Sequence, residues 1–180
     1  MNFRAASIPG LVVIEPRVFG DTRGSFFEVY RRDLFVAAGI NDDFVQDNAS
    51  SSVRGTLRGL HYQTAPAEQA KLVRVVSGEI FDVAVDLRPG SATYGRWHAE
   101  TLSAENRRML YVPTGFAHGF LVTSDRAEVL YKATAYYAPQ LEKGIAWNDA
   151  SLKIQWPKVG CDYILSDRDR CNPSLQTKKG

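Results

Sequence analysis

The chain has 180 residues, which suits one domain, and its apolar share of 44% and charged share of 23% are typical of a globular protein. The net charge is only +2 and no segment gathers many lysines and arginines, which argues against nucleic acid or an anionic membrane as a partner. We find no signal-peptide core, no apolar run of membrane-spanning length and only two unpatterned cysteines, Cys161 and Cys171, so we expect a cytoplasmic protein.

Short runs rich in valine, phenylalanine and tyrosine predict β-strands along the chain. The runs cover residues 11–15, 25–30, 71–76, 79–87, 109–112, 119–123 and 129–137. Turn residues separate them: Ser77-Gly78 predicts a hairpin, Pro89-Gly90 closes the next strand, and Pro113 with Gly115 breaks another. This spacing predicts an all-β antiparallel sandwich or barrel.

Helical signals are few. We expect a short helix over residues 34–38, capped by Asp33 and ended by Gly39, a turn at residues 103–106, and disorder at most in the tail at 178–180. The chain lacks the alternating βαβ pattern and the glycine-rich phosphate loop of dinucleotide-binding folds. A Rossmann enzyme that uses NAD is therefore disfavoured.

Side-chain alternation on two predicted strands indicates a polar interior. In the strand at residues 79–87, Asp82 lies opposite its apolar neighbours and is expected to face the lumen of a barrel. In the strand at residues 129–137, Tyr131 and Tyr137 share one face with two alanines, which is how a ligand groove would look. Such residues also have ordinary explanations, because strand tyrosines are usually core or interface aromatics.

His61, His118 and Lys71 are the candidate chemical groups. Lys71 follows His61 at a spacing that allows it to join the same cavity from the next strand. A lone strand histidine is more often a surface or hydrogen-bonded core residue, and Lys71, Arg58 and Arg23 are by default solvated charges. Residue types alone therefore leave both interpretations open.

Two segments, residues 59–78 and 113–118, resemble the cupin barrel. Metal-binding cupins carry an H-x-H pair on the first segment, whereas this chain has Gln63 at the second position. A metal would be left with His61, His118 and Glu68, and the nearby ammonium of Lys71 would oppose a cation. We therefore expect no metal and no cofactor, with a metal-dependent cupin as the alternative.

A longer set of motifs resembles the dTDP-4-dehydrorhamnose 3,5-epimerase family from about residue 10 to about residue 170. The motifs are RGSFFE at 23–28, QDN at 46–48, LRGLHYQ at 57–63, KLVRV at 71–75, DVAVDLR at 82–88, PTGFAHGF at 113–120, YK at 131–132, WND at 147–149 and SDRD at 166–169. The resemblance implies a homodimeric cupin-type double-stranded β-helix, or jelly-roll barrel. It implies one domain over residues 1–180, with residues 1–30 contributing to the dimer and residues 160–180 forming a C-terminal extension.

That family inverts C3 and C5 of dTDP-4-keto-6-deoxyglucose without metal or cofactor. By resemblance His61 is the general base, Asp169 orients it, Lys71 stabilises the enolate oxygen and Tyr131 returns a proton from the other face. The roles are physically reasonable, because removing a proton beside a ketone needs a base that titrates near neutral pH and a positive group at the oxygen. Inversion needs an acid on the opposite face, and a tyrosine is protonated at pH 7.

The resemblance also implies substrate contacts. Arg58 would bind the diphosphate or sugar, Tyr137 would stack on the thymine opposite Phe26, and Asp82 would pair with His118 as a structural partner. Residues that line the family's ligand site match Arg23, Glu28, Gln46, Asn48, His118, Glu142 and Arg168. The family has lysine where this chain has Arg168. The N-terminal strands would cross to the partner and carry Arg23 and Glu28 into its site.

Three other functions remain open at this stage. A relative with narrower scope would invert only C3 or C5, or act on another nucleotide sugar. A metal-dependent cupin oxygenase or isomerase is opposed by Gln63. A non-catalytic sugar-binding cupin is opposed by the presence together of His61, Lys71, Tyr131 and Asp169.

Overall fold

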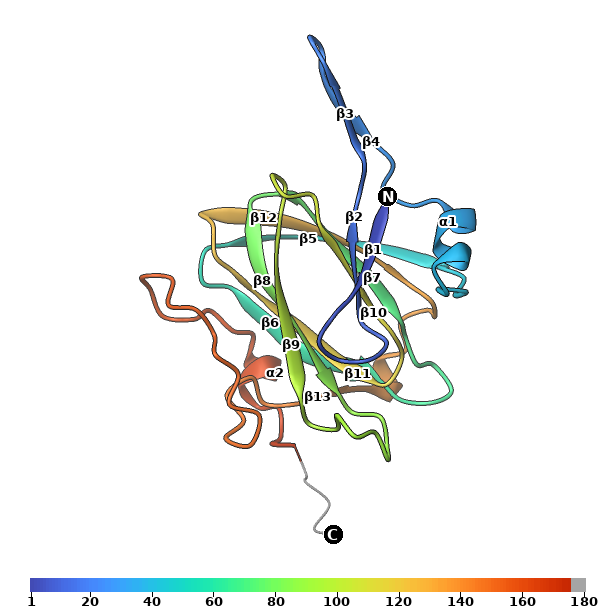
Figure 1. Cartoon of the computed structure of the whole chain (residues 1–180). Helices are drawn as coiled ribbons and strands as arrows, with labels where there is room; N and C mark the ends of the chain where they lie inside the picture. Colours follow the sequence, from blue (N-terminus) through green and yellow to red (C-terminus); the bar gives the residue numbers. More distant parts are fainter. Residues whose placement is uncertain (176–180) are drawn as a thin grey trace.

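The computed structural model describes residues 1–175, and its two antiparallel sheets face each other to form a barrel (Figure 1). The six-stranded sheet has the order β1 (Asn2–Ala5), β2 (Val12–Glu15), β10 (Met109–Val112), β7 (Lys71–Ser77), β12 (Arg126–Ala133) and β5 (Gln46–Val53). The five-stranded sheet has the order β13 (Glu142–Gly144), β6 (Leu57–Gln63), β11 (Phe116–Val122), β8 (Glu79–Asp86) and β9 (Trp97–Ser103). The expected all-β, cupin-type jelly roll is confirmed.

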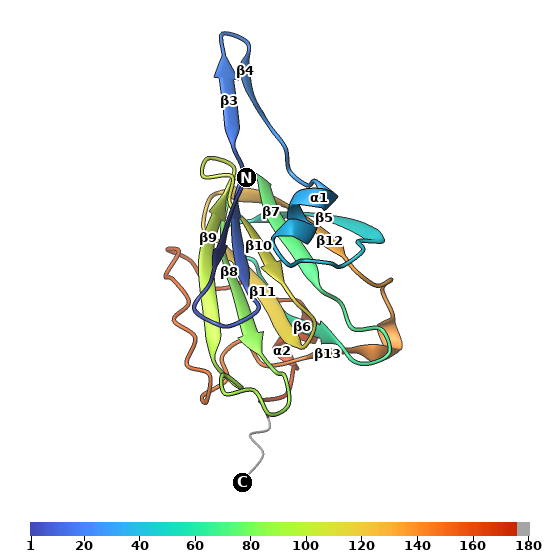
Figure 2. The same ribbon diagram turned by 45° about the vertical axis from the view of Figure 1, so that its right-hand side comes forward.

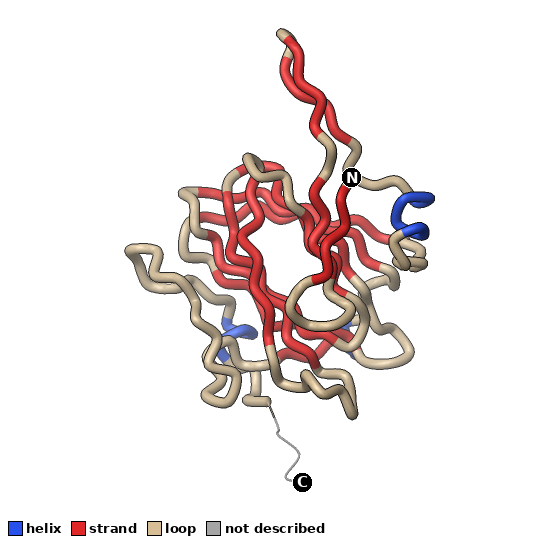
Figure 3. The backbone as a smooth tube through the Cα atoms, viewed as in Figure 1, coloured by secondary structure: helices blue, strands red, loops and turns tan. Residues whose placement is uncertain are grey.

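Smaller elements surround the barrel. A hairpin of β3 (Val18–Asp21) and β4 (Gly24–Phe27) projects well beyond it, which two views show from different sides (Figures 1 and 2). The helical elements are α1 (Arg32–Ala37), the 3-10 turn η1 (Pro139–Leu141) and α2 (Asp167–Arg170), so strands and loops make up most of the chain (Figure 3). Among residues 1–175, no helix has the length and apolar character needed to cross a membrane.

The main core lies between the sheets because alternate residues of each strand point inward. Val73 and Val129 from the six-stranded sheet meet Ile80, Leu102 and Phe120 from the five-stranded sheet. The outer face of the five-stranded sheet is covered by a second cluster that includes the C-terminal side chains Ile145, Leu152, Ile154 and Trp156. The segment that carries these side chains continues to α2, so apolar packing fixes the position of that helix.

The connection at Ser77-Gly78 is not the expected hairpin. β7 and β8 belong to different sheets, so these two residues carry the chain across the barrel wall. Gly78 has φ of +77° and a Cβ there would lie 2.0 Å from the carbonyl oxygen of Arg126. The corner is therefore too tight for a side chain, which sequence spacing alone does not reveal.

Other boundaries also differ from the expectations. β12 ends at Ala133 rather than at residue 137, because Ala133 pairs with Lys71 and Gln46, where both neighbouring strands begin. Asp33 does not cap α1: the N-cap is Arg31, and Asp33 lies in the first turn. The turn at 103–106 is present, with hydrogen bonds between Ser103 and Asn106 in both directions. The tail at 178–180 lies outside the described residues.

An irregularity between β6 and β11 directs two side chains to the same side of the sheet. His118 pairs with His61 and Phe120 pairs with Arg58, so three steps along β6 match two steps along β11. Without this bulge, Arg58 and His61 would point to opposite faces. The strands approach closely here, because a Cβ on Gly59 would lie 2.6 Å from Gly119 Cα.

We predict that Gly59→Ala lowers the free energy of unfolding by about 3 kcal/mol, because Gly59 has φ of +129° and no room for a methyl group. Gly24→Ala is the matched control: Gly24 has φ of +133°, but no atom lies within 4 Å of the added carbon. The control should cost only about 1 kcal/mol. Urea unfolding measures both, and equal losses would contradict the proposed close approach.

Candidate active site

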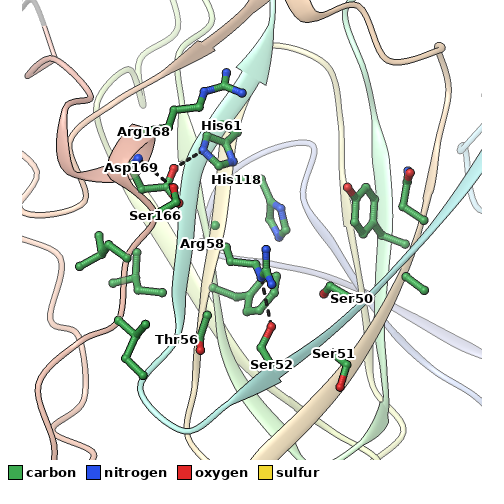
Figure 4. A pocket seen from close by; sticks show the side chains of 18 of the residues that line it. Ser50, Ser51, Ser52, Thr56, Arg58, His61, His118, Ser166, Arg168 and Asp169 are labelled. Carbon is green, nitrogen blue, oxygen red and sulfur yellow. Dashed lines mark hydrogen bonds and ion pairs between the residues drawn. The ribbon is translucent and has the colours of Figure 1, made fainter.

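A cavity of about 780 Å³ lies between the sheets and is closed on one side by the C-terminal segment (Figure 4). Strands β5, β6, β7, β11 and β12 supply its walls, together with residues 164–169. The predicted site residues that line it are Asn48, Arg58, His61, Lys71, His118, Tyr131, Arg168 and Asp169. These residues come from distant parts of the sequence and meet only in the folded barrel.

His61 and Asp169 form a hydrogen-bonded pair at the cavity wall. His61 Nε2 lies 2.5 Å from Asp169 Oδ1, and the Asp169 side chain is buried (Figure 4). Burial raises the pKa of Asp169, but hydrogen bonds from His61, Ser166 and the Gly59 backbone outweigh it and hold the pKa below its usual value. The carboxylate is therefore ionised and accepts the Nε2 proton, which leaves Nδ1 as the free acceptor.

The position of Asp169 follows from local structure. Ser166 is the N-cap of α2, and its hydroxyl oxygen accepts a hydrogen bond from the Asp169 backbone. The chain before the helix is fixed to the barrel by a parallel bridge between Ile164 and Thr56. The sequence motif SDRD thus works as a capped helical turn that presents its buried aspartate to His61.

Lys71 and Tyr131 lie together on the opposite sheet. The Lys71 ammonium is 5.8 Å from the centre of the Tyr131 ring, and both side chains line the cavity. Burial lowers the pKa of Lys71 to about 8, although Glu142 and Asp82 partly oppose this shift. Burial, with Glu142 and Tyr137, raises the pKa of Tyr131 despite Arg58. Tyr131 is therefore a protonated phenol at neutral pH. Lys71 is mostly protonated at neutral pH, but its pKa lies close enough for it to give up the proton readily.

A second histidine–carboxylate pair lies deeper in the barrel. His118 Nε2 lies 2.8 Å from Asp82 Oδ1, and both side chains are buried. The Asp82 side chain points into the barrel, as strand alternation predicted, because it shares a face with the core residues Ile80 and Ala84. The pair lies behind His61, whose strand position is directly across from His118.

The inner face of β5 is polar, and the sequence pattern does not predict a strand for this segment. Asn48, Ser50 and Ser52 alternate with more exposed residues and line the cavity. Ser52 Oγ accepts a hydrogen bond of 3.1 Å from Arg58 Nε, which fixes the direction of the guanidinium (Figure 4). A polar residue at every second position was the available signal, but the segment lacks the β-branched and aromatic residues that usually mark a strand.

Three predicted binding residues form a network at the rim. Glu142 Oε2 accepts hydrogen bonds of 2.6 Å from the Tyr137 hydroxyl and from Arg168 Nη1. Burial raises the pKa of Glu142, but these two hydrogen bonds and the charges of His61 and Arg168 bring it below its usual value. Gln46 joins the rim by accepting from the Tyr137 backbone and donating to Asn48. The rim thus holds the half-exposed Tyr137 ring beside the cavity.

Three other predicted residues lie away from the cavity of their own chain. Arg23 and Phe26 belong to the projecting hairpin, where Phe26 is 67% exposed and Arg23 pairs with Asp21. Glu28 follows the hairpin and pairs with Arg31. None of the three lines the cavity, so a single chain does not bring them into the site.

The residues present do not suit a metal ion. The Gln63 amide nitrogen donates to the carbonyls of Ala67 and Tyr136, and its oxygen accepts from the Ala138 backbone. Glu68 is exposed and does not line the cavity. No group of three or more histidine, cysteine, aspartate or glutamate side chains within 1–175 has a geometry that could hold a metal. The histidines of the cavity are instead paired with carboxylates.

Comparison with known proteins identifies the chain as a cupin-type isomerase of carbohydrates. A family model described as dTDP-4-dehydrorhamnose 3,5-epimerase matches residues 5–177, and the chain belongs to that family. The dTDP-4-dehydrorhamnose 3,5-epimerase of Pseudomonas aeruginosa is 56% identical over 171 residues, which cover 94% of this chain and 93% of the relative.

Two solved structures with similar folds belong to enzymes of different reaction scope. A dTDP-6-deoxy-D-glucose-3,5-epimerase from Legionella pneumophila, in complex with dTDP-4-keto-L-rhamnose, has a TM-score of 0.93 and 46% identity, covering 96% of this chain and 92% of that one. A 3'-monoepimerase from Streptomyces bikiniensis, in complex with dTDP-quinovose, has a TM-score of 0.87 and 38% identity, covering 93% and 85%. The shared fold therefore hosts both double and single inversion.

We predict that Lys71→Met raises the free energy of unfolding by about 1–3 kcal/mol at pH 7, because the enclosed ammonium is destabilising. The pKa of Lys71 is lower in the folded chain than in the unfolded chain, so the penalty is complete below pH 8 and fades as the pH rises towards 10. The advantage of the variant should therefore shrink over that range. Urea unfolding at pH 7 and pH 10 measures it, with exposed Lys143→Met as control. An equal effect of both substitutions would contradict the assigned burial.

Proposed function

We propose that this chain inverts C3 and C5 of dTDP-4-dehydro-6-deoxy-D-glucose to give dTDP-4-dehydro-L-rhamnose. The observation that carries the proposal is the arrangement of His61, backed by Asp169, across one cavity from Lys71 and Tyr131. A base on one wall, facing a cation and a phenol on the opposite wall, is the arrangement that enolisation followed by reprotonation requires. Family membership supports the same substrate class.

Proton removal begins at His61. Nδ1 accepts the proton from the carbon beside the ketone, the C–H electron pair forms the enolate, and its negative charge develops on the C4 oxygen. Asp169 holds the ring through Nε2 and stabilises the imidazolium that forms. The Lys71 ammonium donates a hydrogen bond to the enolate oxygen, for which its lowered pKa makes it a better acid than an exposed lysine.

Inversion is completed by Tyr131. Its hydroxyl gives a proton to the carbon from the face opposite His61, the enolate collapses to the ketone, and the phenolate regains a proton from solvent. The raised pKa of Tyr131 keeps the proton available until a carbanion-like acceptor forms. The His61 imidazolium releases its proton to solvent, and the same steps are then repeated at the second carbon on the other side of the ketone.

The remaining residues of the cavity and its rim account for the nucleotide. Arg58 and Arg168 supply positive charge for the diphosphate, with Arg168 in the place of the family's usual lysine. Tyr137 offers an aromatic face to the thymine. Gln46, Asn48 and Glu142 orient the rim through their hydrogen bonds. Asp82 keeps His118 fixed as a binding residue of the cavity wall.

The projecting hairpin supports a homodimer. Phe26 and Phe19 are large apolar residues exposed on a hairpin that leaves the barrel, which is a costly arrangement for an isolated chain (Figure 2). We infer that Arg23, Phe26 and Glu28 complete the site of a second copy. The cytoplasm remains the proposed compartment, and it is compatible with the free, exposed thiols of Cys161 and Cys171.

Inversion at one carbon only is the second candidate, because the 3'-monoepimerase shares the fold. We expect chelator-treated protein in heavy water to incorporate deuterium at both C3 and C5 of dTDP-4-keto-6-deoxyglucose, since enolisation occurs on each side of the ketone. Mass spectrometry and proton NMR measure the label. Label at one carbon would select the narrower activity, and label at neither would overturn the proposal.

Two variants distinguish the role of the base, His61, from the role of the acid, Tyr131. His61→Ala should slow deuterium incorporation by at least about 100-fold, while Tyr131→Phe should slow inversion about tenfold more than incorporation, because the enolate still forms. Tyr62→Phe is the control, since Tyr62 packs on the outer face of the sheet and does not line the cavity. Incorporation at the parent rate in His61→Ala would show that another base operates.

Complementation tests the hairpin. Arg23→Ala and His61→Ala chains should each have low activity, and mixed dimers should recover about half of the parent rate per dimer. Recovery is expected because one site then combines an intact His61 with an intact Arg23 from the partner. If Arg23 acted in its own chain, both sites would carry a lesion and no activity would return.

A further inference from the structure

Three ionisable side chains of β8 and β9 point into the barrel. Asp82 pairs with Glu100, and His98 pairs with Ala84, so these residues lie on one face of the sheet. The same face carries Ile80 and Leu102, which belong to the core between the sheets. Asp82, His98 and Glu100 are therefore neighbours in the barrel interior, beyond His118 as seen from the cavity.

Two buried atoms in this group lack partners. Asp82 Oδ1 accepts from His118, but Asp82 Oδ2 has no hydrogen-bond partner within residues 1–175. His98 Nδ1 lies 2.9 Å from Ser7 Oγ, whereas His98 Nε2 is buried and also without a partner in the described part of the chain. Leaving buried polar atoms unpaired is unfavourable, and these two belong to diagonal neighbours on paired strands, so one explanation for both is the simplest.

Glu100 lies directly across from Asp82 but does not itself accept a hydrogen bond from His98 Nε2. His98 Nε2 and Glu100 Oε2 are 3.9 Å apart, which is too far for a hydrogen bond. Glu100 is held in place by Arg4 at 3.3 Å and by Arg108 at 2.9 Å, so it is not free to approach. A gap of this length between fixed polar groups suits one bridging water molecule.

We propose that His98 Nε2, Asp82 Oδ2 and Glu100 Oε2 form a buried water site, which makes His98 a positioning residue for the Asp82–His118 pair. One water molecule at this site gives a hydrogen-bond partner to both unpaired atoms. The water accepts one bond from His98 and donates one bond to each carboxylate. It thus makes three bonds, the number typical of buried waters.

The protonation of His98 is consistent with this count. Burial lowers the pKa of His98, Arg4 lowers it further, and Glu100 and Asp82 oppose the shift without reversing it. The ring is therefore neutral at pH 7 and carries one proton. Two carboxylates lie on the Nε2 side and one hydroxyl on the Nδ1 side, so the proton resides on Nε2 and Nδ1 accepts from Ser7.

The site links the surface to the cavity wall. Ser7 is exposed, and from it hydrogen bonds run through His98, the water and Asp82 to His118, which lines the cavity. Fixing both oxygens of Asp82 prevents the carboxylate from rotating, and the His118 ring is held with it. His98, on the edge strand β9, thereby controls the orientation of His118, which lines the cavity.

Nitrogen-15 NMR of the histidine rings tests the proposal without substrate. We expect His98 to carry its proton on Nε2 and the His118 Nε2 proton to exchange slowly with solvent. His98→Gln keeps a donor near the Nε2 position and should preserve the His118 signal, whereas His98→Asn reaches only the Nδ1 position. His98→Asn should speed exchange of the His118 proton at least about tenfold and lower Tm by roughly 3–8 °C.

A crystal structure at a resolution of about 1.3 Å supplies the direct observation. Ordered water within hydrogen-bond distance of all three atoms is the expected result. A proton on Nδ1 of His98, equal effects of the glutamine and asparagine variants, or direct contact between His98 and a carboxylate would each overturn the proposal. These outcomes are independent of whether the chain epimerises one carbon or two.

Discussion

The hydrogen bond between His61 and Asp169 joins residues that are 108 positions apart in the sequence. The barrel supplies the imidazole and the C-terminal segment supplies the carboxylate. Each partner has its own support, because the β6 bulge turns His61 into the cavity and the Ser166 cap holds Asp169 in α2. The site therefore exists only when the C-terminal segment is packed on the barrel, which couples apolar packing on the outer face to chemistry inside.

Ionisable side chains inside the barrel are unfavourable for stability. Lys71, Asp82, Asp169 and His118 all lie in a barrel whose core is packed with apolar side chains. Each of these ionisable groups is tolerated because a hydrogen bond or an opposite charge accompanies it, and Lys71 is the least compensated of the four. An enclosed ammonium destabilises the fold while it favours negative charge in a ligand, which is the usual conflict between stability and function.

The sequence predicts the resemblance and the strands β2, β4, β7, β8, β10, β11 and β12, but not the local irregularities or the strands β1, β3, β5, β6, β9 and β13. Residues 109–112 form the expected strand, and alternation places Asp82 on the correct face. The pattern does not predict β5 because the inner face of this strand is polar, and it places Tyr137 in a strand that in fact ends where its neighbours begin. Strand alternation would also separate Arg58 from His61, because a bulge depends on contacts with another strand. These features arise from tertiary packing, which residue type and spacing do not encode.

The most direct test of the proposed chemistry is a crystal structure of this protein with dTDP-4-keto-L-rhamnose bound. The arrangement predicts that the carbon beside the ketone lies within about 3.5 Å of His61 Nδ1, and that the C4 oxygen lies within hydrogen-bond distance of Lys71 Nζ. Tyr131 should lie on the opposite face of the sugar. A sugar ring bound outside the cavity, or with its ketone directed away from Lys71, would contradict the account.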